Sequence, residues 1–593
     1  MLVFIAQNMA PIMFASLIIF LLFGYPVAFS LAANGLLFFF IGVELAPYSG
    51  GEISLSWPLL YALPERFWGT MSNETLLAIP FFTFMGLILE RSGMAEDLLD
   101  TVGQLFGPIR GGLAYAVILV GALLAATTGV VAASVIAMGL ISLPIMLRYG
   151  YDRRLASGVI AASGTLAQII PPSLVLIVLA DQLGRSVGDM YKGALIPGLV
   201  LTGIYMGYIL IMSIIRPKSV PALPMEARTL GSGVTSLIVA LVGAAIVAYG
   251  AHLWLAPTHG SNADILGATV GVIVIYVVAI LDKSLGIGMM SRLAQQVIIV
   301  LIPPLALVFL VLGTIFLGIA TPTEGGAMGA VGALVMAMAK RRLSLDLVRQ
   351  ALTSTTRLSS FVMFILLGAR VFSLTFYGVN GHLWVEHLLT SLPGGEVGFL
   401  IVVNLLVFFL AFFLDFFELA FIIVPLLAPA AESLGIDLIW FGVLLGINMQ
   451  TSFMHPPFGF ALFYLRSVAA RVPYIDKITG KQIAPVTTGQ IYWGAVPFVC
   501  IQVIMVGLAI VFPGMVMHYK GKVVDPNSIE IVVPPFGGDS GLGLSPFSAP
   551  PGSDGSQGAP NLGQPPSFGT PPAGGGSAPQ QPAPNDLSQP PKF

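Results

Sequence analysis

Two double prolines interrupt long apolar stretches of this 593-residue chain, and polar residues precede each of them. The first interruption, residues 164–173, reads Gly-Thr-Leu-Ala-Gln-Ile-Ile-Pro-Pro-Ser, and the second, 448–457, reads Asn-Met-Gln-Thr-Ser-Phe-Met-His-Pro-Pro. Proline removes a backbone donor from a helix and frees a carbonyl one turn earlier. Freed carbonyls, together with hydroxyl and amide oxygens, suit a small cation such as sodium. The interruptions therefore indicate an ion or substrate site, or else proline kinks that neighbouring helices satisfy.

The interruptions belong to an internal repeat. A shift of 285 residues places five constrained residues on residues of the same type: Pro144 on Pro429, Gly150 on Gly435, Asp152 on Asp437, Pro171 on Pro456 and Pro172 on Pro457. A duplicated apolar unit with prolines inside its hydrophobic segments is typical of secondary transporters, whose sites lie where helices are broken.

The composition requires a membrane environment. Hydrophobic residues make up 56% of the chain and charged residues 9%, whereas soluble domains carry about 25% charged residues. We therefore expect an all-α polytopic protein of the lipid bilayer. The net charge of −2 argues against nucleic-acid binding. A single cysteine, Cys500, excludes a disulfide framework within the chain and a cysteine-based metal site.

Apolar segments and polar loops divide the chain into four parts. The first repeat spans 1–230, with a hairpin at 112–147 and a broken helix at 153–182; an additional helix pair and linker span 231–290; the second repeat spans 291–513, with a hairpin at 398–434 and a broken helix at 438–470; a Pro/Gly-rich tail spans 514–593. The tail cannot bury enough apolar surface to offset its ordering entropy. We expect it to be disordered, as a passive extension or as a docking segment for a partner.

Basic residues indicate that the two repeats cross the membrane in opposite directions. Arg148, Arg153 and Arg154 surround Gly150, which places this corner in the cytoplasm. The equivalent corner around Gly435 holds acidic residues and no base, so it faces outside. The repeats are therefore predicted to be inverted about an axis in the membrane plane. Each hairpin then starts and ends on one side, either as a re-entrant loop or as two ordinary crossing helices.

Charged residues inside apolar sequence are further candidates. Asp415 and Glu418 lie among phenylalanines, and carboxylates at membrane depth are costly and usually functional. They could hold a cation, take up a proton or cap the helix that follows. Glu324, in the polar segment 321–326, either complements a helix dipole or shares the cation site. Arg370 could reach a substrate carboxylate, or it extends to the membrane surface from the end of its helix.

The sequence offers few candidate residues for metal binding, haem binding or ATP hydrolysis. The six histidines show no four-residue helical spacing typical of a zinc site, and they offer no haem ligands within spans. His455, beside the second double proline, either contacts the substrate or hydrogen-bonds locally. The chain has no phosphate-binding loop for ATP, so energy must come from an ion gradient or from a partner. We expect no enzyme activity and no cofactor, with a membrane subunit of a redox complex as an alternative.

At these motifs the chain resembles the large membrane (permease) subunit of the tripartite ATP-independent periplasmic (TRAP) transporters, the DctM-like family. The likeness covers roughly residues 20–510. The matching stretches are Ala-Ile-Pro-Phe-Phe at 78–82, Gly-Tyr-Asp at 150–152, the first interruption within 158–173, Ile-Pro-Gly at 196–198, Thr-Pro-Thr-Glu at 321–324 and Pro-Pro-Phe-Gly at 456–459. Together these motifs are specific, although each alone is weak.

The resemblance implies a sodium-coupled symporter of the bacterial inner membrane that imports a small organic anion such as a carboxylate. A periplasmic substrate-binding protein would deliver the solute, and a small TRAP membrane subunit would sit beside this chain. Two re-entrant hairpins and two broken helices would form the mobile part of an elevator mechanism. A single-component sodium/anion symporter of similar architecture is the alternative, and uptake without a binding protein would favour it.

The resemblance also assigns candidate sodium regions. By position, one region takes the first hairpin tip and the first interruption, with Thr127, Thr128, Gly129, Gly164 and Thr165. The other takes Thr321, Pro322, Thr323, Asn448, Gln450 and Thr451, and Asp415 completes the candidate set for substrate and ions. Thr321→Ala is predicted to weaken sodium-dependent uptake more than it lowers expression.

This chain departs from the family at two of these places. The family commonly has Gly-Ser-Ser at the first hairpin tip, where this chain has Thr127-Thr128-Gly129. It commonly has threonine before the second double proline, where this chain has His455. These departures mean that the resemblance assigns neither the number of coupling ions nor the solute.

Overall fold

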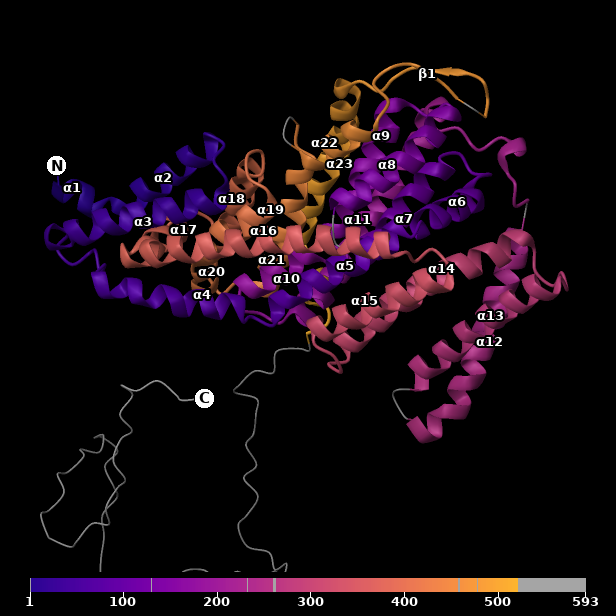
Figure 1. Ribbon diagram of the computed structural model, residues 1–593, viewed down its shortest axis with the longest axis horizontal. Coiled ribbons are helices and arrows are strands. Elements are labelled where there is room, and N and C mark those ends of the chain that lie inside the picture. The colour runs from indigo at the N-terminus through magenta and orange to yellow at the C-terminus, as the bar shows by residue number, and fades with distance from the viewer. Residues whose placement is uncertain are drawn as a thin grey trace, which may run out of the picture. The chain divides into compact units, whose positions relative to one another are not determined.

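A computed structural model describes residues 2–128, 131–231, 233–259, 263–456, 459–476 and 478–520. Within these residues the chain is mainly helical, and its strands form one short antiparallel hairpin, β1 (Tyr474–Ile475) with β2 (Gln482–Ile483) (Figure 1). Eight described helices are long and apolar enough to cross a membrane, or up to ten if each of two bent pairs counts as one span. The predicted all-α membrane fold is confirmed.

The first half of the chain follows the predicted order of scaffold helices, hairpin and broken helix. Its α-helices are α1 (Leu2–Gln7), α2 (Met9–Leu22), α3 (Val27–Leu45), α4 (Leu63–Met71), α5 (Ala78–Arg91), α6 (Met94–Phe106), α7 (Gly112–Thr128), α8 (Val131–Arg148), α9 (Arg153–Thr165), α10 (Leu174–Gln182) and α11 (Val187–Ile215). Its 3₁₀ turns are η1 (Ala46–Tyr48), η2 (Trp57–Ala62), η3 (Thr75–Leu77), η4 (Leu166–Gln168), η5 (Pro217–Ser219) and η6 (Met225–Ala227).

The second half begins with the additional pair and then repeats this order. Its α-helices are α12 (Val234–His259), α13 (Ala263–Leu285), α14 (Arg292–Phe316), α15 (Pro322–Ala339), α16 (Leu345–Gly378), α17 (Gly381–Thr390), α18 (Gly395–Leu410), α19 (Phe416–Glu418), α20 (Val424–Ser433), α21 (Leu438–Met449), α22 (Phe460–Val468), α23 (Thr488–Val511) and α24 (Gly514–Met517). A π-helix, η8 (Leu419–Ile423), joins α19 to α20, and a 3₁₀ turn, η9 (Gln450–Phe453), follows α21.

The folded part of the chain extends beyond the predicted start of the tail at residue 514. Val516 of α24 is fully buried, and Lys520 bonds the carboxylate of Asp437. These anchors explain the difference, because a short apolar helix that packs on the bundle need not show a long hydrophobic run. The remainder of the predicted tail, from residue 521, lies outside the described residues.

The repeat recurs in atomic detail at the corner before each broken helix. Gly150 and Gly435 adopt φ values of 84° and 77°, a left-handed conformation that glycine adopts without steric cost. Two residues later, Asp152 caps α9 and Asp437 caps α21, and each accepts two backbone N–H bonds from the first helical turn. The same local chemistry therefore shapes both corners.

Two ion pairs show how the corners lie relative to the broken helices. Arg148, at the end of α8, pairs with Asp476 on the β-hairpin after α22 at 2.9 Å. Arg185, after α10, pairs with Glu432 near the end of α20 at 2.6 Å. In Figure 1, α9, α22 and β1 accordingly lie in the upper part of the view, and α10 and α20 lie below them. Each corner thus lies beside the far end of the other repeat's broken helix, as inverted repeats require.

Long helices of the two repeats pack in a reciprocal way. α3 lies along α16, and α15 lies along α5. Glycines permit the first of these contacts: a Cβ on Gly368 of α16 would lie 2.4 Å from the carbonyl oxygen of Ala28, and one on Gly35 of α3 would lie 2.9 Å from backbone atoms of Phe372. These helices form a scaffold beside the hairpins and the broken helices.

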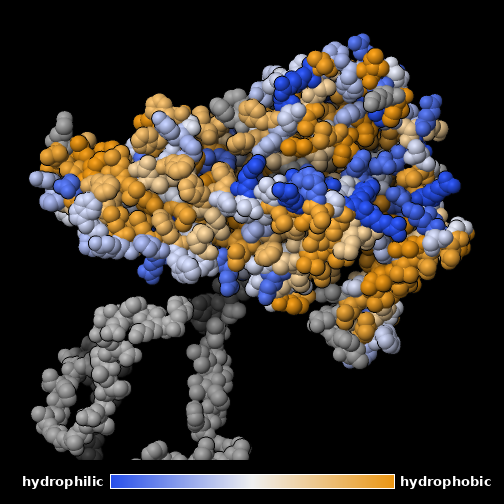
Figure 2. All heavy atoms as spheres, in the orientation of Figure 1, coloured by the Kyte–Doolittle hydropathy of each residue, from blue (hydrophilic) through white to orange (hydrophobic). Residues whose placement is uncertain are grey.

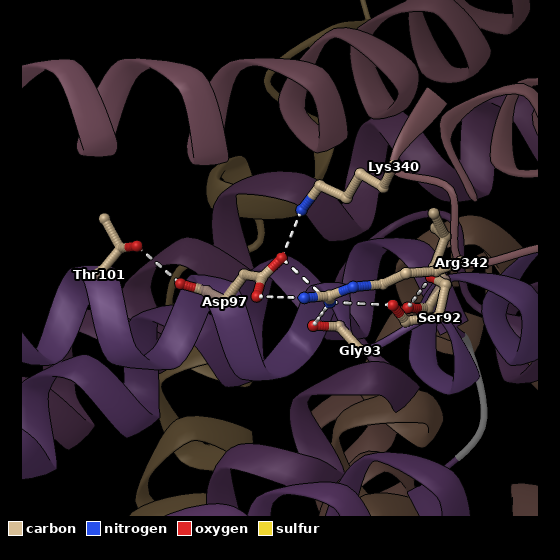
Figure 3. Close-up of polar contacts among 7 residues, drawn as sticks. Ser92, Gly93, Asp97, Thr101, Lys340 and Arg342 are labelled. Carbon is tan, nitrogen blue, oxygen red and sulfur yellow. Dashed lines mark hydrogen bonds and ion pairs between the residues drawn. The ribbon is translucent and has the colours of Figure 1, made fainter. Parts of the chain in front are cut away.

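A polar cluster ties this scaffold together at the end of α15. Lys340 contacts the Asp97 carboxylate on α6 at 2.6 Å, and Arg342 donates to both oxygens of that carboxylate at 3.2 Å (Figure 3). Arg342 also donates to the carbonyls of Ser92 and Gly93 at 3.1 and 3.0 Å. Basic residues outside the spans mark the cytoplasmic side, so the cluster joins the first repeat to the second on that face.

The additional pair forms a small apolar cluster of its own. α12 and α13 pack on each other and on α14 around Leu237, Ile275 and Val297. Much of α12 is exposed apolar surface, including Val239 and Trp254. The pair of α12 and α13 is mainly orange, that is hydrophobic, at the lower right of Figure 2. Helices this apolar require lipid or another membrane helix around them.

Candidate functional site

Both predicted interruptions are buried where one helix ends and the next has not begun. Thr165, at the end of α9, and Gln450 and Thr451, in η9, are fully buried. Gln168 and Asn448 are within 2% of full burial. In a membrane protein such polar groups need partners inside the protein, so their contacts show what the site is built for.

Thr165 is the centre of a hydrogen-bond network that joins the two repeats. Its hydroxyl accepts from Gln450 Nε2 at 3.2 Å and from Gln502 Nε2 at 3.4 Å, and it donates to the carbonyl of Ala162 at 2.8 Å. Gln502, on α23, also donates to the hydroxyl of Tyr205, on α11, at 3.0 Å. The network connects the first interruption to the second and to the helix that follows each broken helix.

The second interruption is also bonded to its own hairpin. Asn448 Nδ2 donates to the backbone and side-chain oxygens of Asn404, on α18, at 2.7 and 3.0 Å. Thr451 donates to the Asn448 carbonyl and Ser452 to the Met449 carbonyl, both at 2.7 Å. A hydroxyl that donates in this way keeps lone pairs that can face a cation. The interruption is thus held in place while oxygen ligands stay available.

A cavity of about 240 Å³ lies where the hairpin tips meet the interruptions. Its wall contains three pairs of residues 285 positions apart: Val131 with Phe416, Ala132 with Phe417, and Gln168 with Phe453. The other lining residues are Leu174, Leu358, Phe361, Asp415, Phe460 and Tyr464. Equivalent positions of inverted repeats meet only near the axis that relates them, so the cavity lies at that axis. The start of α8 in the first hairpin and the start of α19 in the second both lie at this cavity, so each hairpin turns at the axis inside the bundle and is re-entrant.

Four helices begin at the wall of this cavity. Val131 is the first residue of α8, Leu174 of α10, Phe416 of α19 and Phe460 of α22, and all four residues line it. The N-terminus of a helix carries a partial positive charge and unpaired N–H groups. Side chains of Ser173 and Asp415 cap α10 and α19, so each of these helices keeps only part of its free N–H groups. The remaining N–H groups favour an anionic ligand although no lysine or arginine is among the lining residues.

The remaining wall is mainly aromatic, with few polar groups. Gln168 is 1% exposed, and its Oε1 has no hydrogen-bond partner among the described residues. Leaving such a buried acceptor unpaired costs about 1–3 kcal/mol. An apolar cavity with a few convergent polar groups is the usual form of a small-molecule site.

Asp415 caps a helix and lines the cavity at the same time. Its Oδ1 accepts the Glu418 N–H at 2.9 Å, and Glu418 Oε2 accepts the Asp415 N–H at 3.0 Å. This reciprocal pair is a capping box, one of the three roles considered for these carboxylates. A carboxylate has about four lone-pair positions, so the cap leaves room for a cation at the cavity wall.

The segment at 321–324 lies away from the interruptions. Glu324 Oε2 accepts from the N–H and the hydroxyl of Thr321 at 2.8 and 3.0 Å, which forms a capping box at the start of α15. Thr323 donates to the carbonyl of Glu74 at 2.6 Å, and Thr321 is exposed. The structure therefore does not bring Thr321, Pro322 and Thr323 to the second interruption. For Glu324 it shows the dipole-complementing role.

The first hairpin tip is described only in part. α7 ends at Thr128, but Gly129 and the side chains of Thr127 and Thr128 lie outside the described residues, so their part in a sodium site stays a prediction. Gly164, across from this hairpin, is buried; a Cβ there would lie 2.3 Å from a methyl of Val135. Glycine at this position lets the hairpin and the broken helix come together.

Two further candidates point away from the cavity wall. His455 stacks on Phe412 with 4.1 Å between ring centroids and meets Phe408 edge-on at 4.4 Å. His455 is thus part of local aromatic packing.

Arg370 is half-buried and donates its Nε to Thr70 on α4 at 3.3 Å. It lines a second pocket, between α4, α16 and α20, and not the central cavity.

Sequence reasoning missed several residues of the site. Gln168 and Phe453 lie inside the two interruptions, and the 285-residue shift places one on the other. That pairing was a sequence signal for both residues. Asn404, Tyr205 and Gln502 carry no such signal, because they lie in ordinary apolar helices far along the chain and reach the interruptions only through packing.

Inverted repeats, re-entrant hairpins and a cavity at their axis define this protein as a secondary transporter. Residues 14–515 match the family model of the tripartite ATP-independent periplasmic transporter, DctM component. The chain belongs to this family and is a large TRAP permease subunit for a small organic substrate, a multi-pass protein of the inner membrane.

Relatives with different solutes cover most of the chain. The C4-dicarboxylate TRAP transporter large permease protein DctM of Pseudomonas aeruginosa is 29% identical over 408 residues, 69% of this chain and 80% of that protein. The ectoine permease TeaC of Halomonas elongata is 24% identical over 86% of this chain and 99% of that protein. The sialic acid permease SiaT of Haemophilus influenzae is 22% identical over 84% and 66%, respectively. A solved transporter structure, YdaH of Alcanivorax borkumensis, is 15% identical, with a TM-score of 0.46 over 82% of this chain and 98% of that one.

Proposed function

We propose that this chain imports a small organic anion by sodium symport. The convergence of four helix N-termini on one cavity carries this proposal, because it offers an anion partial positive charge inside the membrane. A C4-dicarboxylate permease and a sialic acid permease among the relatives support an acidic solute. A periplasmic substrate-binding protein delivers the solute, and a small membrane subunit sits beside this chain, as the tripartite family description supports.

The cavity wall favours a solute with a flat apolar body. Phe361, Phe416, Phe417, Phe453, Phe460 and Tyr464 supply six aromatic rings around about 240 Å³. Aromatic walls stack on a planar ring and shield it from water. The carboxylate of such a solute faces the helix N-termini, and its ring faces the phenylalanines.

Sodium binds at the oxygens of the two interruptions. The Thr451 hydroxyl, the side-chain oxygen of Asn448 and the carbonyls near them are hard ligands of the second interruption, and Asp415 adds a negative charge at the cavity wall. The Thr165 hydroxyl already accepts two hydrogen bonds and donates one, so it positions the two interruptions. The hairpins and broken helices move as one body against the scaffold of α3, α5, α15 and α16. This elevator step carries the cavity from one face to the other.

Uptake into proteoliposomes tests this function. The full chain, reconstituted with its small membrane subunit and supplied with its binding protein, should accumulate labelled benzoate under an inward sodium gradient and not under an equal potassium gradient. Excess succinate should compete less than excess benzoate. Equal uptake under both gradients would contradict sodium coupling, and full uptake without the binding protein would favour a single-component symporter.

A pair of phenylalanine variants tests the cavity itself. Phe453→Ala removes a ring from the wall and should raise the benzoate concentration for half-maximal uptake at least about tenfold, because a buried aromatic contact contributes about 1.5–3 kcal/mol. Phe463→Ala, on α22 but exposed, is the matched control and should leave it unchanged. Equal behaviour of the two variants would exclude this cavity as the solute site.

A further inference from the structure

A second pocket, of about 310 Å³, opens beside the Gly435 corner. It lies between α4 and α16 on one side and α20 with the end of α10 on the other. Arg66 and Arg370 line the first side, and Asp181 and Glu432 line the second. The sequence immediately around Gly435 holds no lysine or arginine, unlike the sequence around Gly150, and this difference predicts that the Gly435 corner faces outside. The pocket therefore lies on the side from which an imported solute arrives.

The acidic residues of this outer pocket already have partners. Asp181 accepts from Asn73 Nδ2 at 2.6 Å and from Gln182 Nε2 at 2.8 Å. Glu432 accepts from Arg185 at 2.6 Å. The carboxylates are thus engaged by residues other than the two arginines of the opposite wall.

The two arginines keep most of their hydrogen-bonding capacity. Arg370 uses its Nε to bond Thr70, which orients the side chain, and a guanidinium has five N–H donors in all. The Arg66 side chain makes no hydrogen bond or ion pair with a described residue. Two guanidiniums on one wall are suited to a carboxylate, which arginine binds in a bidentate, planar fashion.

The outer pocket adjoins the central cavity along the same two elements. Leu366 of α16 and Phe421 of η8 line the outer pocket, and Phe361 and Phe417 line the cavity about one helical turn away. Phe417 stacks on Phe421 at 6.2 Å and meets Phe361 edge-on at 6.3 Å. The rings of Phe421, Phe417 and Phe361 therefore form a row of contacts between α16 and the second hairpin, from the outer pocket to the cavity.

We propose that Arg66 and Arg370 form a receiving site for the carboxylate of the arriving solute. The anion is held there after release from the binding protein and before it passes between α16 and the second hairpin. The ligand class is a small organic carboxylate, and this proposal rests on the anion import proposed above. The guanidiniums act at the outer face only, and the helix N-termini replace them once the solute reaches the cavity.

Chemical protection tests the receiving site without transport. Phenylglyoxal modifies accessible arginines, and mass spectrometry of the full chain in membrane vesicles can follow Arg66 and Arg370 separately. Benzoate, used as the probe anion without sodium, should slow modification of both at least threefold. Arg349, exposed near the other end of α16, is the internal control and should react at an unchanged rate. Equal rates for all three arginines with and without benzoate would overturn the proposal.

Uptake kinetics separate this site from other roles. Arg66→Gln and Arg370→Gln should each raise the KM for solute about tenfold, with kcat within a factor of two of the wild type. Arg370→Lys should recover part of this loss. Arg349→Gln is the control and should leave both KM and kcat unchanged. Arg66→Gln removes no contact with a described residue, so it reports on the site even if Arg370→Gln fails to fold. A higher requirement for binding protein at unchanged solute KM would mean that the arginines dock that protein, and the proposal would be wrong. Protection by benzoate without sodium-driven uptake would support the site and contradict the proposed function.

Discussion

Gln450 donates its side-chain amide to the hydroxyl of Thr165 at 3.2 Å, and the two residues occupy the same position in the two repeats, 285 residues apart. A contact between equivalent positions places both on the axis that relates the repeats. The two broken helices therefore meet at their interruptions inside the bundle. The central cavity, lined by three further equivalent pairs, follows from the same symmetry.

Removal of the Thr165 hydroxyl should destabilise this junction. Thr165→Val deletes the acceptor for two buried glutamine amides, and an unsatisfied buried group costs about 1–3 kcal/mol. We expect a lower melting temperature of the purified protein and loss of most uptake. Thr353→Val is the control, because the exposed Thr353 hydroxyl bonds the carbonyl of Arg349 in its own helix and no other described residue. Equal melting temperatures for the two variants would contradict the role of the junction.

Asp415 can be separated into its two roles by substitution. Asparagine caps a helix about as well as aspartate does, but it carries no charge. Asp415→Asn should keep the melting temperature and raise the sodium concentration for half-maximal uptake about tenfold, whereas Asp415→Ala should also cost about 1 kcal/mol of stability. The readouts are thermal unfolding and sodium titration of uptake. An unchanged sodium dependence in Asp415→Asn would restrict this residue to capping.

Thr321→Ala should act on stability and leave ion coupling alone. The capping box at the start of α15 contributes about 1 kcal/mol, and Thr321 is exposed rather than part of the second interruption. We therefore expect lower thermal stability with an unchanged sodium dependence of uptake. This differs from the prediction made from the family resemblance. A large shift in the sodium titration would return Thr321 to the ion site.

The ion pair between Arg148 and Asp476 should give stability a pH dependence. Hydrogen bonds from Thr479 and from Arg148 lower the pKa of Asp476 from 3.8 to about 2. A carboxylate with a lowered pKa stabilises the folded state above its ordinary pKa, and the effect is lost as pH falls from about 4 through about 2. Asp476→Asn should therefore melt below the wild type at pH 7, and the two curves should converge toward pH 3.

Asp346→Asn serves as the control for this pH series. The Asp346 carboxylate bonds Gln350 one turn along the same helix and is exposed. Its substitution should shift the melting temperature little at any pH. A difference between wild type and Asp476→Asn that stays constant from pH 7 to pH 3 would contradict the assignment.

Much of the architecture could be predicted because it depends on local chemistry. Gly150 and Gly435 mark the corners by their conformational freedom, and Asp152 and Asp437 mark the helix starts as caps. The double prolines mark the interruptions because proline cannot donate a backbone hydrogen bond. The membrane setting and the inverted direction follow from apolar content and from the distribution of arginine.

The contents of the site could be predicted only in part. Asn448, Gln450, Thr165 and Gly164 are buried at the interruptions, and their role in binding ions or substrate stays a prediction. Thr321 does not join them, because a polar break in an apolar sequence gives no information about depth in the bundle. Gln502, in the middle of the apolar helix α23, gives no local sign that it bonds Thr165.

The sequence by itself determined that this protein is a membrane permease of two inverted repeats, each with a broken helix. Those properties are encoded by single residues and their spacing, because caps, glycine turns and prolines act within one or two helical turns. Only the tertiary structure decided that the hairpin tips, the interruptions and four helix N-termini surround one aromatic cavity. That decision depends on how helices hundreds of residues apart pack, and packing is set by shape and volume, which no short motif records.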